Sequence, residues 1–386
     1  MRDTTDDVTT VIDGGRILTP DGLVKGALAL AEDRIVGVLD GPPPASARRI
    51  DASGRLVLPG IIDIHGDAFE RQIMPRPGTT FPIDLALLES DRQLVANGIT
   101  TAFHGVTVSW EPGLRSLDNA KAVIAALWGL RSRLRCDTRL HIRWEIFALD
   151  AIDTVIGWLD QDQTPILAFN DHTTNGMEKG HIQAKIPQNA ERSGLSVEAY
   201  EARLHAVWSR RSDVPAAVER VAAAARAAGA VLLAHDERSP EERRHFRALG
   251  AMASEFPMNR ETALTARKAG EQTILGAPNV VRGGSHIKML DAATAIGEGL
   301  CTVLASDYYY PAPLLAAFRL VHDGVTDLPS AWALISTNPA DVAGLSDRGR
   351  IAPGMRADLV VVDDRDHERP RVATTIVAGR AVIQAS

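Results

Sequence analysis

The chain of 386 residues contains only two cysteines, Cys136 and Cys301, too few for a disulfide framework or a thiolate metal cluster. It has no apolar stretch of the roughly 20 residues that cross a bilayer. The first residues, MRDTTDDVTT, lack the apolar core of a secretory signal. An excess of basic residues is also missing, because the formal net charge is −7. We therefore expect a cytoplasmic protein without a nucleic-acid or membrane partner.

Short β-rich runs, broken by Gly, Asp and Pro, occupy both ends of the chain. In the C-terminal piece they predict strands at 359–362 and 373–383. Neither piece is long enough to bury a core by itself. We therefore expect residues 1–58 and 347–386 to combine into one small β-sandwich.

Residues 59–346 alternate apolar runs with Ala-rich helical stretches. The predicted strands lie at 61–65, 99–104, 140–146, 166–171, 231–236, 252–256, 273–277 and 302–307. Eight buried strands separated by helices predict an α/β fold, a (β/α)8 TIM-type barrel. One connection, at 173–213, is much longer than the others, and we expect a polar loop followed by the amphipathic piece SVEAYEARLHAVW. Long insertions on barrels commonly serve as lids over the site.

Ionisable side chains gather at the predicted carboxyl ends of these strands, where barrel active sites lie. They are His65, Asp67, Glu145, His172, His235 and Asp307. Imidazole and carboxylate ligands suit Zn best in this setting, and Mn, Fe and Ni also accept them. The number of groups exceeds what one four-coordinate ion needs, which predicts two divalent ions. Glu145 is then the expected bridging ligand, and Asp307 the group that also accepts a proton.

A histidine at the end of a strand can equally be a hydrogen-bonded structural group, and several residues are better explained in that way. His104, His141 and His205 are assigned to this class. Asp171 and Asp236 adjoin proposed ligands, and we expect them to orient a ligand or cap a helix.

The pattern of HxD on the first strand, histidines on two later strands and aspartate on the last strand resembles the amidohydrolase superfamily. Longer blocks resemble the PhnM family of the carbon–phosphorus lyase pathway. They are PGIIDIHGDAFERQIMPRPG, LLESDRQLVANGITTAF, HIRWEI, AHDE, GAPNVVRGGSH and ASDYYYPAPLL. The resemblance implies hydrolysis of the 5-triphosphate of α-D-ribose 1-methylphosphonate by metal-activated water, with release of diphosphate.

A substrate of this kind is a small anion and requires local positive charge. The two prolines of PRPG restrict the direction of Arg76, and a guanidinium binds phosphate through paired hydrogen bonds. The stretch VVRGGSH places Arg282 beside a glycine pair whose N–H groups can form an anion nest. The full set of expected substrate contacts is Arg76, Arg282, Ser285, His286, Arg71 and Lys179.

Two other functions stay open. One keeps the metal site but cleaves a C–N bond, in a cyclic amide or a small heterocycle that is deaminated, and the unusual segment at 173–190 favours it. The other is a non-catalytic scaffold, which predicts lost ligands, although all six strand-end positions hold competent side chains. A homodimer is expected only because dimers are common.

Overall fold

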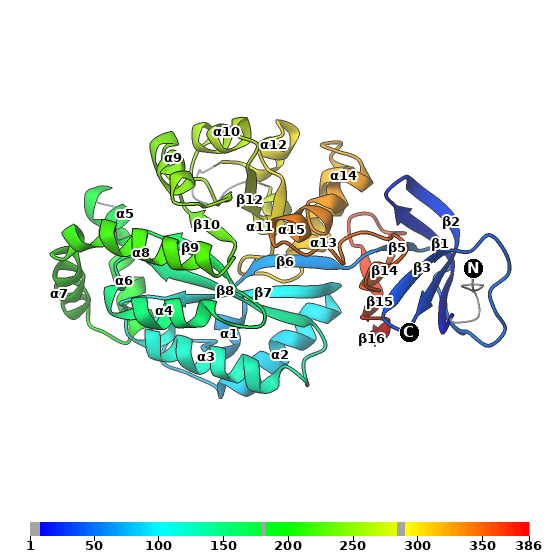
Figure 1. The fold of residues 1–386 in the computed structure, drawn as a ribbon, viewed down its shortest axis with the longest axis horizontal. Coiled ribbons are helices and arrows are strands. Elements are labelled where there is room, and N and C mark those ends of the chain that lie inside the picture. The colour runs from blue at the N-terminus through cyan, green and yellow to red at the C-terminus, as the bar shows by residue number, and fades with distance from the viewer. Residues whose placement is uncertain (1–7, 180–181, 284–289, 386) are drawn as a thin grey trace.

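The computed structural model describes residues 8–179, 182–283 and 290–385, and it contains two large sheets (Figure 1). Eight parallel strands form one of them, in the order β13-β12-β11-β10-β9-β8-β7-β6. They are β6 (Ile61–Gly66), β7 (Ile99–Val108), β8 (Asp137–Glu145), β9 (Ile166–Asn170), β10 (Leu232–His235), β11 (Ala253–Glu255), β12 (Gln272–Gly276) and β13 (Val303–Ala305). All eight predicted strands are present, and the barrel prediction is confirmed.

The barrel closes where the chain after β13 meets the end of β6. The backbone N–H of Asp307 donates to the carbonyl of His65, and the N–H of Asp67 donates to the carbonyl of Asp307, both at 2.9 Å. The buried carboxylate of Asp63 accepts the N–H of Ser306 at 2.9 Å and its hydroxyl at 2.5 Å. This closure brings the first and last strands together at their carboxyl ends.

Helices follow most of the strands and surround the barrel (Figure 1). They are α1 (Phe69–Ile73), α2 (Ile83–Ala96), α3 (Leu117–Leu130), α4 (Ile152–Leu159), α5 (His172–Lys179), α6 (Ile182–Ser193), α7 (Val197–Trp208), α8 (Val214–Ala227), α9 (Pro240–Ala248), α10 (Arg260–Lys268), α11 (Ala277–Arg282), α12 (Ala292–Gly297), α13 (Ala312–His322), α14 (Leu328–Ala333) and α15 (Thr337–Val342). Short 3-10 turns occur at Gly113–Arg115, Leu149–Ala151 and Arg211–Asp213. Among the described residues, no helix combines the length and apolarity needed to span a membrane.

The first part of the long insertion differs from the expected polar loop, because it folds largely as helices α5 and α6, while the amphipathic piece that follows forms α7. Ser196 caps the start of α7 by accepting the N–H of Ala199 at 3.2 Å. A small apolar cluster of its own contains Ile186, Tyr200 and Leu204, all buried. These buried apolar residues explain why a segment of mostly polar composition folds into helices. In Figure 1 the inserted helices lie at the opposite end of the molecule from the chain termini.

The second sheet is built from both ends of the chain, as expected. Its strands are β1 (Thr10–Thr19), β2 (Gly22–Ala31), β3 (Arg34–Val38), β4 (Arg48–Asp51), β5 (Leu56–Pro59), β14 (Leu359–Asp363), β15 (Arg371–Val377) and β16 (Arg380–Gln384). The N- and C-terminal pieces join where β5 pairs antiparallel with β14. The single strand expected at 373–383 is instead a hairpin, turned by Ala378 and Gly379 in the left-handed region. A Cβ on Gly379 would lie 1.8 Å from the carbonyl oxygen of Glu32, so only glycine fits there.

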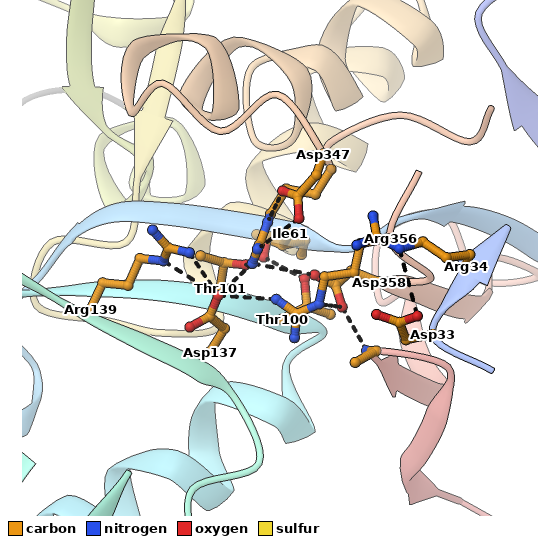
Figure 2. Close-up of polar contacts among 12 residues, drawn as sticks. Asp33, Arg34, Ile61, Thr100, Thr101, Asp137, Arg139, Asp347, Arg356 and Asp358 are labelled. Carbon is orange, nitrogen blue, oxygen red and sulfur yellow. Dashed lines mark hydrogen bonds and ion pairs between the residues drawn. The ribbon is translucent and has the colours of Figure 1, made fainter. Parts of the chain in front are cut away.

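A cluster of charges connects the amino ends of the barrel strands to the terminal sheet (Figure 2). One carboxylate oxygen of Asp137 lies 2.6 Å from Arg348, 3.0 Å from Arg356 and 3.2 Å from Arg139. Arg348 also donates to the hydroxyl of Thr101 at 2.9 Å. Burial opposes ionisation of Asp137, but these guanidinium groups keep its pKa below the usual value.

Replacing Asp137 by Ala should lower the free energy of unfolding by about 3 kcal/mol, because it leaves several guanidinium groups without their shared anion. The lowered pKa means that this contribution is complete above the unfolded value of 3.8 and is lost below it. Urea unfolding at pH 7 measures the loss, and the difference between the two proteins should shrink as the pH falls below 3.8. The control is Asp153→Ala, which removes an exposed ion pair with Arg220 and should cost less than about 1 kcal/mol.

Candidate functional site

The carboxyl ends of the barrel strands bring three groups of ligand-type side chains together. The ligand atoms within each group all lie within 4.8 Å of one another. The groups are His65 with Asp67 and Asp307, His172 with His235 and Asp236, and His65 with His141 and Glu255. The rings of His65 and His235 are 5.3 Å apart, so the first two groups adjoin.

His65 has the features of a metal ligand. Its Nδ1 lies 2.8 Å from a carboxylate oxygen of Glu255, so Nδ1 carries the hydrogen and Nε2 carries the lone pair. Nε2 is buried and has no hydrogen-bond partner among the described residues. Burial lowers the pKa of His65 to about 3, which keeps the ring neutral. A neutral buried imidazole with a free lone pair fits a divalent cation.

Asp67 and Asp307 flank His65 but differ in charge. Asp67 accepts a hydrogen bond from Arg143 at 2.9 Å, and Arg115 lies 3.8 Å away. Burial opposes ionisation, yet these two arginines hold the pKa of Asp67 below the usual value. Burial and the nearby Asp67 raise the pKa of Asp307 to about 7. One carboxylate is therefore a fixed anion, and the other can exchange a proton near neutral pH.

The second group forms where α5 begins. The Nδ1 of His172 lies 3.2 Å from Glu145, and its Nε2 lies 3.2 Å from Asp236. Burial opposes protonation, but hydrogen bonds to the two carboxylates raise the pKa of His172 to about 9. Burial lowers the pKa of His235, whose Nδ1 lies 3.0 Å from Asp236. A cation bound here would have to displace the proton from His172.

Glu145, the expected bridging ligand, lies outside these three groups. One of its oxygens accepts the hydroxyl of Thr173 at 2.8 Å and the N–H of the same residue at 3.2 Å. The other accepts the N–H of His172 at 3.1 Å. Glu145 therefore binds the N-terminus of α5, where carboxylates are stabilised by free N–H groups. A bridging role stays a prediction.

The inserted helices are connected to Glu145 through Thr173. The indole N–H of Trp110 donates to the hydroxyl of Thr173 at 2.9 Å, and that hydroxyl donates to Glu145. Tyr200 of α7 and Arg192 of α6 both bind the carboxylate of Glu111, at 2.7 and 2.5 Å. The insertion is therefore anchored on the loop after β7, beside the candidate site.

The sequence reasoning missed Arg143 and Glu255. Arg143 lies on β8 two residues before Glu145, so both side chains leave the same side of the strand. Its guanidinium is buried, donates to Asp67 and lies 3.4 Å from the Nε2 of His235. Glu255 ends β11, and the same rule that selected the other strand-end residues would have found it. His141 is a hydrogen-bonded histidine, whose Nδ1 donates to the carbonyl of Ile64 at 2.9 Å.

Two of the expected substrate contacts meet at one tyrosine. The guanidinium of Arg71 lies 5.5 Å from the ring centroid of Tyr308, and Arg282 lies 3.4 Å from its hydroxyl. Tyr308 is the residue directly after Asp307, just beyond the end of β13. Arg76 is exposed in the turn after α1, where its carbonyl accepts the N–H of Thr79. Ser285, His286 and the side chain of Lys179 lie outside the described part of the chain.

Known proteins resemble this chain in sequence. Residues 198–383 match the model of the amidohydrolase family. The alpha-D-ribose 1-methylphosphonate 5-triphosphate diphosphatase of Escherichia coli (strain K12) is 30% identical over 369 residues, which cover 92% of this chain and 96% of that enzyme. The adenine deaminase of Brucella abortus (strain 2308) is 28% identical over 393 residues. That match covers 97% of this chain but only 57% of the deaminase.

Solved structures resemble it in fold. An amidohydrolase from an environmental sample of the Sargasso Sea aligns with a TM-score of 0.67 and 14% identity, over 97% of this chain and 93% of its own. Molinate hydrolase aligns with a TM-score of 0.64 and 15% identity, over 97% and 95%. At this level of identity, the likeness supports the barrel and its companion sheet and says nothing about substrate.

Replacing Thr173 by Val should loosen the anchor of the inserted helices, because it removes a buried hydrogen bond to a carboxylate and leaves the indole N–H of Trp110 without its acceptor. We expect a loss of about 1.5–3 kcal/mol in the free energy of unfolding. Hydrogen exchange should also become faster in α5, α6 and α7. Thr173→Ser keeps the hydroxyl and is the matched control. Equal stability and equal hydrogen-exchange rates in the Val and Ser variants would contradict this account of the anchor.

Proposed function

The chain belongs to the amidohydrolase family and is a hydrolase, and from that premise we propose that it hydrolyses the 5-triphosphate of a ribosyl phosphonate to release diphosphate. The observation that carries the proposal is the convergence of His65, Asp67 and Asp307 at the closure of the barrel, where the Nε2 of His65 has no hydrogen-bond partner in the part of the chain that the structure describes. The extent of the match to the diphosphatase, nearly the whole length of both chains, supports the choice of substrate.

We propose as metal ligands the six residues expected from the strand ends, and we add Asp236, which was expected only to orient a ligand or cap a helix, because it lies with His172 and His235. They are His65, Asp67, Glu145, His172, His235, Asp236 and Asp307, and all but Glu145 belong to the ligand-type groups. Divalent ions, when bound, lower the pKa of water and withdraw charge from phosphoryl oxygens. The chain itself supplies a neutral imidazole at His65 and a carboxylate at Asp67 that Arg143 holds in place. We assign proton acceptance to Asp307, whose carboxylate lies beside His65 and Asp67 at the closure of the barrel.

The proposed phosphate contacts are the guanidinium groups of Arg71 and Arg282. Both are exposed and both contact Tyr308, the residue after Asp307. Guanidinium groups bind phosphate through paired hydrogen bonds, and two of them can bind neighbouring phosphates of one chain. They provide exposed positive charge in a protein of net charge −7. Four further substrate contacts stay proposals, because the described residues give no contact between them and the ligand-type groups. They are Arg76, Ser285, His286 and Lys179.

The direct test incubates the metal-loaded protein with α-D-ribose 1-methylphosphonate 5-triphosphate and follows the products by phosphorus NMR. We expect diphosphate to appear, and we expect His65→Ala to lower kcat/KM by at least about 10³-fold, because it removes one ligand atom from the metal centre. The matched control is His205→Ala, since His205 is exposed on α7. Wild-type protein that holds metal and leaves the triphosphate intact would refute the proposed substrate.

Metal removal gives a second prediction. Prolonged dialysis against a chelator should abolish turnover, and Zn, Mn, Fe or Ni added back singly should identify the working ion. Elemental analysis of the reloaded protein should give two ions per chain. Full activity in the chelated protein would contradict the metal requirement, and a single ion at full activity would contradict the two-ion site.

A second candidate function is C–N bond hydrolysis in a small anionic cyclic amide or a heterocycle. The match to adenine deaminases, over 97% of this chain, favours it. In that case Arg71 and Arg282 would bind a carboxylate or phosphonate of the substrate. Release of ammonia from adenine, or opening of a cyclic amide, would support this function if the triphosphate is not cleaved.

A further inference from the structure

We propose that Glu255 is a positioning residue that sets the tautomer and direction of His65. The proposal rests on the proposed role of His65 as a metal ligand and adds a specific partner to it. Neither the sequence pattern nor the similarity to known enzymes assigns a role to Glu255.

The contact crosses the interior of the barrel. His65 lies on β6 and Glu255 on β11, and in the closed barrel β12 and β13 separate these two strands. Both side chains are fully buried, and the Nδ1 of His65 lies 2.8 Å from a carboxylate oxygen of Glu255. A hydrogen bond of this length between fully buried groups fixes which nitrogen carries the hydrogen. The lone pair of Nε2 is then available for a cation.

Glu255 faces a second imidazole but receives no hydrogen from it. The Nε2 of His141 lies 3.6 Å from the other oxygen of Glu255. The Nδ1–H of His141 already donates to the carbonyl of Ile64, so Nε2 of the neutral ring is an acceptor. Of the two histidines that face this carboxylate, His65 is the one that donates to it. Between these two histidines, the carboxylate therefore accepts a hydrogen bond only from His65.

Phe256, the residue after Glu255, packs against the same histidine. Its ring meets His65 edge-on at 4.9 Å between centroids and His235 edge-on at 5.1 Å. Phe256 follows β11 directly, and its φ of 54° lies in the left-handed region. Rotation of the His65 ring by half a turn would face a carbon toward Glu255 and leave a buried carboxylate without its donor.

The experiment compares Glu255→Met, which removes the acceptor, with Glu255→Gln, which keeps an acceptor oxygen for the Nδ1–H. Cobalt(II) titration followed by absorbance reports both affinity and ligand geometry. We expect Glu255→Met to weaken cobalt binding about 10–100-fold and to change the d–d spectrum. Glu255→Gln should recover most of the affinity. The tautomer of His65 is read independently from ring nitrogen shifts in metal-free protein.

The matched control is Glu237→Met. Glu237 is equally buried and contacts Ser254, the neighbour of Glu255 on β11, but it pairs with Arg243 and lies in none of the three ligand-type groups. This variant should keep wild-type cobalt affinity while losing stability. Equal weakening in both Met variants would overturn the proposal, because general loosening of β11 would explain it.

The two proposals fail in different ways. If wild-type protein binds no cobalt, the proposed metal-dependent function falls, and the nitrogen shifts alone decide whether Glu255 sets the tautomer. If cobalt binds and His65 keeps Nδ1–H in Glu255→Met, the positioning role is wrong and the metal function stands.

Discussion

The backbone pairing of Asp307 with His65 and Asp67 is the interaction on which the site depends. It closes the barrel and, in the same step, brings two carboxylates beside one imidazole. The buried carboxylate of Asp63 stabilises the closure by accepting hydrogen bonds from the backbone N–H and the hydroxyl of Ser306. The contacts that close the barrel therefore also build the candidate site, since the strands that close the fold carry its ligand-type side chains.

Positive charge is concentrated where the overall composition would not suggest it. Arg143 and Arg115 hold Asp67 ionised, whereas Asp307 lies near Asp67 with a raised pKa. Arg71 and Arg282 both contact Tyr308. An acidic protein can present such a site because the Coulomb interactions of a buried group depend mainly on the nearest few charges, while distant surface charges are screened.

The strand-end rule predicted much of the candidate site. It selected His65, Asp67 and Asp307, which the structure brings together, because parallel strands expose their carboxyl ends on one side of a barrel. It could not show that the oxygens of Glu145 bind the start of α5. That outcome depends on the path of the inserted helices. The few apolar residues of their small cluster are hard to recognise in a polar stretch of sequence.

The sequence by itself determined where the eight strands lie and which chemical groups end them, because buried strands require apolar runs and metal chemistry requires imidazoles and carboxylates. Only the tertiary structure decided which of those groups meet. Glu255 and His65 are 190 positions apart and touch across the barrel interior. Such a contact depends on strand order, closure and the exact reach of each side chain, and local sequence patterns carry no information about any of the three.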